Sequence, residues 1–226
     1  MIRAVLTDIE GTTSSLSFVK EVLFPYARAH LAEFLQQRKD DAEVQALLAD
    51  ARREIGGAPD DQALVEALQR WIDEDRKVTP LKALQGLIWE TGYHSGELSG
   101  HIYDDAYAAL RAWHRRGLRL YVFSSGSVKA QKLLFGHTKK GDLQPLFEDY
   151  FDTTVGAKRD PAAYQRIAET IGIASSEILF LSDVTEELDA AKTAGMKTYW
   201  LVRDAKTPLR AGHRVARRFD EILFSD

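Results

Sequence analysis

The sequence predicts an α/β protein in which a Rossmann-like parallel sheet core carries an inserted, all-helical cap domain. Short apolar runs of the kind found in strands buried on both faces recur along the chain, and helical patterns separate the later ones. Such alternation implies a parallel sheet with right-handed crossovers. From about residue 18 to residue 116, by contrast, apolar residues keep a helical spacing and no convincing strand occurs, which predicts the insertion.

The core is expected to contain four strands and a short fifth, with helices between the later ones. Gly195 closes the last of these helices, in the position where glycine commonly ends one. The expected strands are residues 2–6, 118–123, 178–181, 198–202 and 222–224, and the expected helices are residues 127–135, 161–171 and 185–194.

The insertion is expected to be a series of helices broken by turn-forming residues. The helices are residues 18–37, 42–55, 62–71, 80–91 and 104–115, and the breaks include residues 56–60 and 96–100. The last of these helices belongs to the sheet domain, because it would cross over into the strand at residue 118. We therefore assign residues 1–13 and 101–226 to the α/β core and residues 14–100 to the helical cap.

The composition is that of an ordinary soluble globular protein. Of the 226 residues, 45% are hydrophobic and 28% charged, which excludes collagen-like and disordered chains. Thirty basic residues against 34 acidic ones give a net charge of −4, without the broad basic surface that nucleic acid binding needs. No segment approaches the roughly 18 continuous apolar residues of a membrane span. Cysteine is absent, which excludes disulfides and thiolate metal sites and makes the cytoplasm the expected location. We expect a monomer with neither nucleic acid nor membrane partners.

Two acidic residues follow the first expected strand, at the edge where ligands bind to open parallel sheets. Asp8 and Glu10 flank the apolar Ile9, and an extended backbone would point both carboxylates the same way. Paired carboxylates suit Mg²⁺, and they also suit covalent catalysis in which one acid is the nucleophile and the other moves the proton. The alternative is an aspartate that caps a helix beside a turn.

Hydroxyl groups follow the second expected strand. Ser124 and Ser125 stand directly before a helix, where side-chain hydroxyls and backbone N–H groups bind phosphate well. The simpler alternative is a serine that only caps the helix. The segment lacks the spacing of a nucleophile elbow, and neither a dinucleotide fingerprint nor a Walker loop occurs.

A lysine and a further acid complete the set. Lys158 precedes a helix N-terminus, where a cation opposes the helix dipole unless an anion lies there; an exposed surface lysine is the alternative. Asp183 follows the third expected strand and is well placed to complete a metal site with the first two acids. Glu187 and Asp189 are left open, because acids early in a helix are expected without any function. Acids, hydroxyls and a cation at one sheet edge are what a phosphate and a magnesium ion need.

The order of these residues resembles the haloacid dehalogenase superfamily of phosphotransferases: a nucleophilic aspartate with an acid two residues on, then a serine or threonine, a lysine and an acidic metal ligand. Within it, the chain is most similar to the enolase-phosphatase (acireductone synthase) family of methionine salvage, over nearly its whole length. Glu10 is distinctive, because most of the superfamily carries aspartate there. The segments that carry this resemblance are residues 8–13, 18–20, 23–26, 124–128, 130–137 and 180–184.

The resemblance implies a magnesium-dependent enzyme that enolises 2,3-diketo-5-methylthiopentyl-1-phosphate and removes its phosphate through an aspartyl phosphate. Asp8 and Asp183 would bind Mg²⁺ through side chains and Glu10 through its backbone carbonyl. Asp8, Glu10 and Lys158 would be catalytic, and Ser124, Ser125 and Lys158 would hold the phosphate.

Two other functions remain open from the sequence. A phosphatase of the same superfamily that acts on another small phosphorylated metabolite would need nearly the same catalytic residues. A phospho-accepting receiver module also places acids, a hydroxyl and a lysine at strand ends. The large insertion after the first acid and the position of Glu10 count against the receiver.

Overall fold

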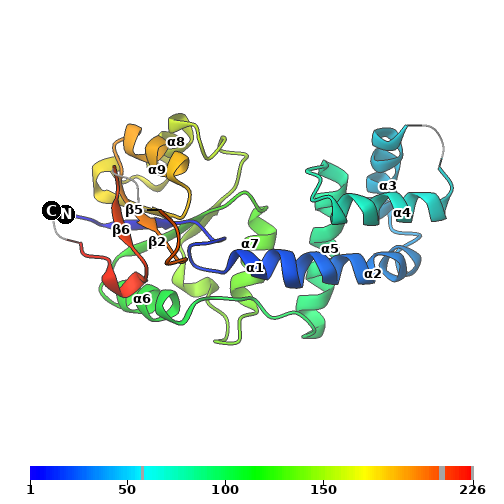
Figure 1. The fold of residues 1–226 in the computed structure, drawn as a ribbon, viewed down its shortest axis with the longest axis horizontal. Coiled ribbons are helices and arrows are strands. Elements are labelled where there is room, and N and C mark those ends of the chain that lie inside the picture. The colour runs from blue at the N-terminus through cyan, green and yellow to red at the C-terminus, as the bar shows by residue number, and fades with distance from the viewer. Residues whose placement is uncertain (57–58, 209–211, 225–226) are drawn as a thin grey trace. The chain divides into compact units, whose positions relative to one another are not determined.

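The computed structural model describes residues 1–56, 59–208 and 212–224, and the chain divides into two compact units. The core unit comprises residues 1–16 and 99–226, and the helical unit comprises residues 17–98. Figure 1 shows the core unit as a sheet with helices and the second unit as helices alone. Part of the expected break at 56–60, Gly57 and Ala58, lies outside the described residues.

The core unit contains a parallel sheet in the order β3-β2-β1-β4-β5-β6, six strands within the described residues. The central strand β1 is paired on one side with β2 and on the other with β4, so that Thr7 lies opposite Val122 and Leu181. This confirms the predicted parallel α/β core. The strands are β1 (Ala4–Thr7), β2 (Arg119–Phe123), β3 (Asp149–Phe151), β4 (Ile178–Ser182), β5 (Lys197–Leu201) and β6 (Arg214–Ala216).

The prediction was wrong at the edges of the sheet: it missed two short strands and expected one that does not form. The short strands β3 and β6 were not predicted, because three residues carry too little periodicity to distinguish a strand from a turn. The strand expected at 222–224 does not form. Phe219 and Phe224 instead pack against the indole of Trp113, with ring centroids 5.5 and 5.1 Å from it, so this apolar run covers a helix.

Four helices of the core unit lie on the sheet: α6 (Asp104–Arg115), α7 (Val128–Gly136), α8 (Pro161–Ile171) and α9 (Thr185–Thr193). Figure 1 shows α8 and α9 on one side of the sheet and α6 on the other. Buried side chains of β1, β2 and β4 pack with α8 and α9 in one apolar cluster. Short 3₁₀ turns occupy Gln144–Leu146, Ser175–Glu177 and Phe219–Glu221.

The local sequence explains where the helices that border the site begin. The Ser127 hydroxyl accepts a hydrogen bond from the backbone N–H of Ala130 and caps α7. The Asp160 carboxylate caps α8 in the same way, and Pro161 occupies the first helical position, where its missing N–H costs nothing. The predicted ranges for α6 and α8 are those observed.

The helical unit contains α1 (Leu16–Phe18), a π-helical turn (Val19–Leu23), α2 (Phe24–Gln37), α3 (Ala42–Ile55), α4 (Asp61–Asp73) and α5 (Thr79–Ser95). One helix was expected over residues 18–37. Pro25 accounts for the π turn, because its ring crowds the carbonyl four residues earlier and the helix widens ahead of it. The N–H of Phe24 accordingly bonds to the carbonyl of Val19, five residues back.

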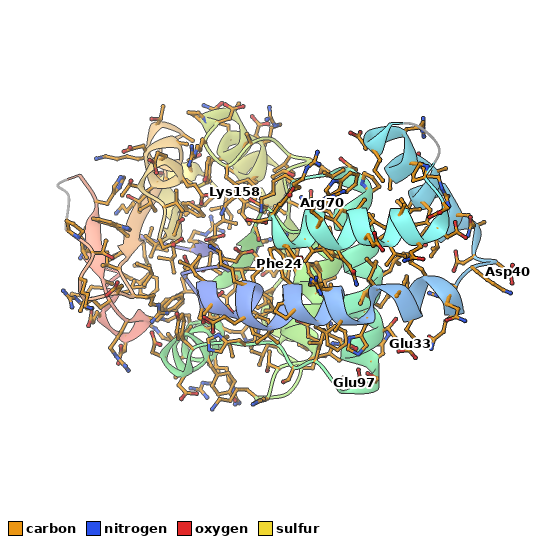
Figure 2. The ribbon with its side chains drawn as sticks, turned by 45° about the vertical axis from the view of Figure 1, so that its right-hand side comes forward. Phe24, Glu33, Asp40, Arg70, Glu97 and Lys158 are labelled. Atoms are coloured by element: carbon orange, nitrogen blue, oxygen red, sulfur yellow. The ribbon has the colours of Figure 1, made fainter. Side chains whose placement is uncertain are left out.

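The helical unit has its own apolar core, built from one face of each of its longer helices. Trp89 stacks on Phe24, labelled in Figure 2, and its indole N–H donates to the carbonyl of Leu23 at 2.8 Å. A side chain at Gly92 would collide with the ring of Tyr26, so only glycine lets α5 approach α2 here. None of the helices in the described segments is both long and apolar enough to cross a bilayer.

Candidate functional site

The candidate site lies where β1, β2 and β4 end side by side. Because Thr7 is in register with Val122 and Leu181, the three strands finish at the same edge of the sheet. Asp8, Ser124 and Asp183 each follow directly after one of these ends. The topology thus gathers residues from three distant parts of the chain, at the edge where open parallel sheets bind ligands.

A lysine between two carboxylates forms the centre of the site. The Nζ of Lys158 lies 2.6 Å from Oδ1 of Asp8 and 2.7 Å from Oε2 of Glu187. The three side chains are 7%, 6% and 11% exposed, so water screens these charges weakly. Lys158 is labelled within the core unit in Figure 2. Its interpretation as an exposed surface lysine is therefore wrong.

Neighbouring groups hold this lysine and its partners in place. The buried hydroxyl of Tyr164, on α8, donates to the carbonyl of Lys158 at 2.7 Å, and the Lys158 ammonium lies 5.7 Å from the ring centroid of Phe123. The hydroxyl of Ser182, at the end of β4, donates to Oε2 of Glu187 at 2.9 Å. Residues of β2, β4 and α8 thus hold the two ion pairs in place.

Burial and charge act in opposite directions on these groups. Burial alone would lower the pKa of Lys158, but the charges of Asp8 and Glu187 and its hydrogen bonds to them raise that pKa instead. Burial raises the pKa of Glu187, and the nearby Lys158 ammonium offsets only part of the effect. The lysine is consequently protonated at neutral pH.

Asp183 is a second carboxylate beside Asp8, and it is half-buried. Burial and the negative charge of Asp8 together raise its pKa to about 7, while Lys158 has only a minor opposing effect. Its backbone carbonyl accepts a hydrogen bond from the Trp200 indole at 2.9 Å. The Asp8–Asp183 pair therefore has too little positive charge around it, which is the condition a bound cation relieves.

Gly11 is the residue that lets the first loop approach Asp183. Its φ is +73°, in the left-handed region, and an added Cβ would overlap the Asp183 carboxylate. We expect Gly11→Ala to lower the free energy of unfolding by about 1–3 kcal/mol, from backbone strain and displacement of that carboxylate. The same variant should need more Mg²⁺ for half-maximal activity; Gly141→Ala, also at positive φ but with open space around it, is the control. An unchanged Mg²⁺ requirement would contradict this account.

The carboxylates fit a magnesium ion better than a metal with many protein ligands. Within the described residues there is no group of three or more histidine, aspartate, glutamate or cysteine side chains that could hold a metal. Asp8 and Asp183 could provide two side-chain oxygens, and the loop after β1 approaches the Asp183 carboxylate at Gly11. Mg²⁺ retains several waters and commonly uses one or two carboxylates, so this donor set suits it.

An extended backbone was expected to point the side chains of Asp8 and Glu10 the same way. The backbone after Asp8 is not extended. The strand ends at Thr7, and the next residues form turns in which the N–H groups of Thr12 and Ser14 both donate to the carbonyl of Ile9. Asp8 is buried and Glu10 is exposed. The alternation of side chains along a strand does not continue through a turn, which explains the difference.

The two serines of the second strand end differ in burial. Ser124 is 5% exposed, and its hydroxyl accepts a hydrogen bond from the backbone N–H of Gly126 at 3.3 Å. Ser125 is exposed at the tip of the loop. The helix cap is Ser127, so neither Ser124 nor Ser125 is occupied in capping α7.

Glu187 is the site residue that the sequence left undecided. It stands in the first turn of α9, where acids are common for electrostatic reasons. Leu188, Ala190 and Ala191 on the same helix are buried, and this apolar face was the available sign that Glu187 points inward too. Asp189 is exposed and lies 3.1 Å from His213, away from the lysine cluster.

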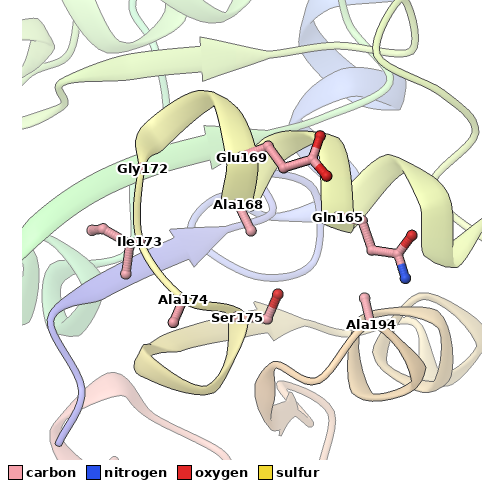
Figure 3. Close-up of a pocket in the computed structure, with 8 residues that line it drawn as sticks. All are labelled: Gln165, Ala168, Glu169, Gly172, Ile173, Ala174, Ser175 and Ala194. Carbon is pink, nitrogen blue, oxygen red and sulfur yellow. The ribbon is translucent and has the colours of Figure 1, made fainter.

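A surface groove on the core unit lies away from the site. Figure 3 shows a groove of about 480 Å³ between α8 and α9, lined by Gln165, Ala168, Glu169, Ala194 and residues 172–175. Residues 172–175 immediately precede the 3₁₀ turn and strand β4, so the groove opens at the amino end of the sheet. The acids and the lysine lie at the opposite end.

Comparison with known proteins gives matches over most of the chain. Residues 2–195 match the model of the haloacid dehalogenase-like hydrolases. The chain is 65% identical to "Enolase-phosphatase E1" of Methylococcus capsulatus, over 90% of both chains. It is 62% identical to the protein of the same name from Thioalkalivibrio sulfidiphilus, over 97% of this chain and 98% of that one. The crystal structure of the UTR4 protein from Saccharomyces cerevisiae superposes with a TM-score of 0.82 at 34% identity, covering 98% of this chain and 100% of that chain.

Proposed function

Since the chain belongs to the haloacid dehalogenase-like hydrolase family, we propose that it is an acireductone synthase, that is, an enolase-phosphatase of methionine salvage. Its substrate would be 2,3-diketo-5-methylthiopentyl-1-phosphate, which it enolises and then dephosphorylates to 1,2-dihydroxy-3-keto-5-methylthiopentene. The relatives named enolase-phosphatase, more than 60% identical over nine-tenths or more of the chain, support this substrate.

The observation that carries the proposal is the buried contact between Asp8 and Lys158. A phosphate dianion needs positive charge to approach an anionic nucleophile, and Lys158 supplies it beside the Asp8 carboxylate. Lys158 occupies Oδ1 of Asp8, whereas among the described residues Oδ2 receives only a long hydrogen bond from Thr12, at 3.4 Å. Oδ2 is accordingly the oxygen we assign as the nucleophile.

Phosphoryl transfer would proceed in two steps. Oδ2 of Asp8 forms a bond to phosphorus while the bond from phosphorus to the substrate oxygen breaks, and the leaving oxygen takes a proton from the Glu10 carboxyl group. Water then attacks the aspartyl phosphate, gives a proton to the Glu10 carboxylate and releases phosphate and free Asp8. Ser124, Ser125 and Lys158 would bind the phosphoryl oxygens throughout.

Asp8 and Asp183 would hold Mg²⁺ through their carboxylates, and Glu10 through its backbone carbonyl. When bound, the ion supplies positive charge that neutralises the phosphoryl group and the carboxylates of Asp8 and Asp183. The chain's own residues meanwhile keep the site rigid: Lys158 remains paired with Glu187, and Trp200 holds the backbone of Asp183. We also propose that the helical unit serves as a cap that excludes water.

Enolisation needs a base before phosphate leaves, and we assign it to Glu10. Its side chain is one methylene longer than the aspartate found in most of the superfamily, and it is exposed rather than buried against the ion pairs. The base removes a proton from the carbon next to a carbonyl group, the electron pair moves onto that carbonyl oxygen, and the oxygen takes a proton from water. The resulting enol phosphate is the substrate of the phosphatase step.

Glu10→Gln should separate the two reactions. The amide cannot take a proton, so we expect enol formation and phosphate release each to slow by about 10²–10⁴-fold, the usual contribution of a general acid or base. Enol absorbance and free phosphate are followed in the same sample, with Glu21→Gln, a change at another exposed glutamate, as the control. Unchanged rates for both steps would remove Glu10 from the mechanism.

A substrate panel tests the proposed substrate. The catalytic efficiency with the diketone phosphate should exceed that with sugar phosphates and other small phosphorylated metabolites by at least about 10²-fold, since only the diketone can be enolised by the same site. Equal efficiencies would instead identify a general phosphatase of the family. We further propose that the protein is cytoplasmic and monomeric. Size-exclusion chromatography with light scattering measures the oligomeric state.

A further inference from the structure

A buried glutamine joins the Ser124–Ser127 loop to the edge of the sheet. Gln131 lies one turn into α7 and is 2% exposed. Its Nε2 donates to the carbonyl of Gly126 at 2.7 Å and to the carbonyl of Phe151, at the end of β3, at 2.9 Å. Both amide protons are thus used, and both acceptors are backbone groups outside α7.

These bonds close a ring of interactions around Ser124. The N–H of Ser124 donates to the same Phe151 carbonyl at 3.1 Å. The N–H of Gly126 donates to the Ser124 hydroxyl at 3.3 Å, and the carbonyl of Gly126 accepts the hydrogen bond from Gln131. Gln131 is the only side chain in this ring apart from Ser124 itself. The ring of hydrogen bonds fixes the N–H and carbonyl of Gly126 and the backbone of Ser124 relative to β3.

Packing alone does not explain the amide. The Oε1 of Gln131 is buried and meets no hydrogen-bond donor within the described parts of the chain. A leucine or methionine would fill the same space without burying that acceptor. The two bonds to Gly126 and Phe151 are what the amide provides and an apolar side chain cannot.

We propose that Gln131 is a positioning residue for phosphate: it holds the Gly126 peptide so that the Ser124 hydroxyl and the exposed Ser125 meet the phosphoryl group in one fixed geometry. The inference rests on the proposed function in one respect, namely that this loop binds phosphate. A phosphoryl group occupies the loop both before and during transfer, so a looser loop weakens binding in both states. Such a change raises KM and leaves kcat nearly unchanged.

The test compares Gln131→Met and Gln131→Leu with the wild type and with Leu133→Ala. Leu133 is 8% exposed on the same helix, and its truncation creates a cavity without touching the loop carbonyls. For each protein with Mg²⁺, the measurements are the Kd for inorganic phosphate by calorimetry, KM and kcat for the diketone phosphate, and the melting temperature. Calorimetry does not require turnover, so it can be interpreted even if the diketone phosphate is not the substrate.

For both Gln131 variants we expect the Kd for phosphate and KM to rise about tenfold, with kcat within about twofold of the wild type. Leu133→Ala should lower the melting temperature and leave both constants unchanged. The inference is overturned if the Gln131 variants bind phosphate like the wild type, if Leu133→Ala weakens binding equally, or if neither Gln131 variant folds. A wild type that binds phosphate but does not turn over the diketone contradicts the proposed function and leaves this inference standing.

Discussion

Asp8→Asn should reduce phosphate release by at least about 10³-fold, because it removes the proposed nucleophile. The amide has nearly the same shape as the carboxylate but is a very poor nucleophile, so no aspartyl phosphate can form. The change also removes one of the two anions that hold Lys158, whose Nζ remains 2.7 Å from Glu187. The fold should therefore survive, and circular dichroism with a urea melt verifies this before the phosphate assay is interpreted.

The matched control for this substitution is Asp189→Asn. Asp189 is exposed on α9 and bonds to His213, so the same chemical change outside the site should leave the rate within about twofold of the wild type. Phosphate release that persists in Asp8→Asn at a rate close to the control would mean that another group attacks phosphorus.

Lys158→Met should cost both activity and stability. Without the ammonium, the carboxylates of Asp8 and Glu187 are left buried and unpaired, and removing one partner of a buried ion pair typically lowers the free energy of unfolding by about 3–5 kcal/mol. Phosphate release should fall by at least about 10³-fold as well, because the charge that lets the phosphate approach Asp8 is lost. Urea denaturation measures the first effect and a phosphate assay the second.

Lys77→Met isolates the contribution of burial. Lys77 also lies 2.6 Å from an aspartate, Asp75, but its side chain is 73% exposed. An exposed pair contributes about 0–1 kcal/mol, so this variant should be nearly as stable as the wild type and fully active. Equal losses of stability in Lys158→Met and Lys77→Met would show that burial of the ion pairs of Lys158 has no energetic consequence.

The central strands and most helices could be predicted because their patterns are strong. The apolar runs of β1, β2 and β4 are buried along their whole length, apart from Arg119 at the start of β2. The edge strands β3 and β6 were missed because three residues show no usable periodicity, and the register that makes them strands is set by β2 and β5. The π turn before Pro25 was missed for a related reason: the spacing of apolar residues barely changes when one turn widens.

The site was predictable where a residue follows directly on a strand. Asp8, Ser124 and Asp183 lie at one sheet edge, since a parallel sheet must bring the ends of neighbouring strands together. The inward orientation of Glu187 and the exposure of Glu10 depend on a helix face and a turn, which the position of a residue after a strand does not reveal. Gln131 was beyond prediction, because its partner Phe151 lies on a strand that the sequence did not indicate.

The central claim is that one site first enolises the diketone phosphate and then removes its phosphate through Asp8. The most direct measurement mixes purified protein and Mg²⁺ with the diketone phosphate and records enol absorbance and free phosphate from the first turnover onward. The account predicts that enol absorbance rises before phosphate appears, and that one phosphate is released for each acireductone formed. Phosphate release from the diketone without prior enol absorbance, or enol formation without any phosphate release, would contradict it.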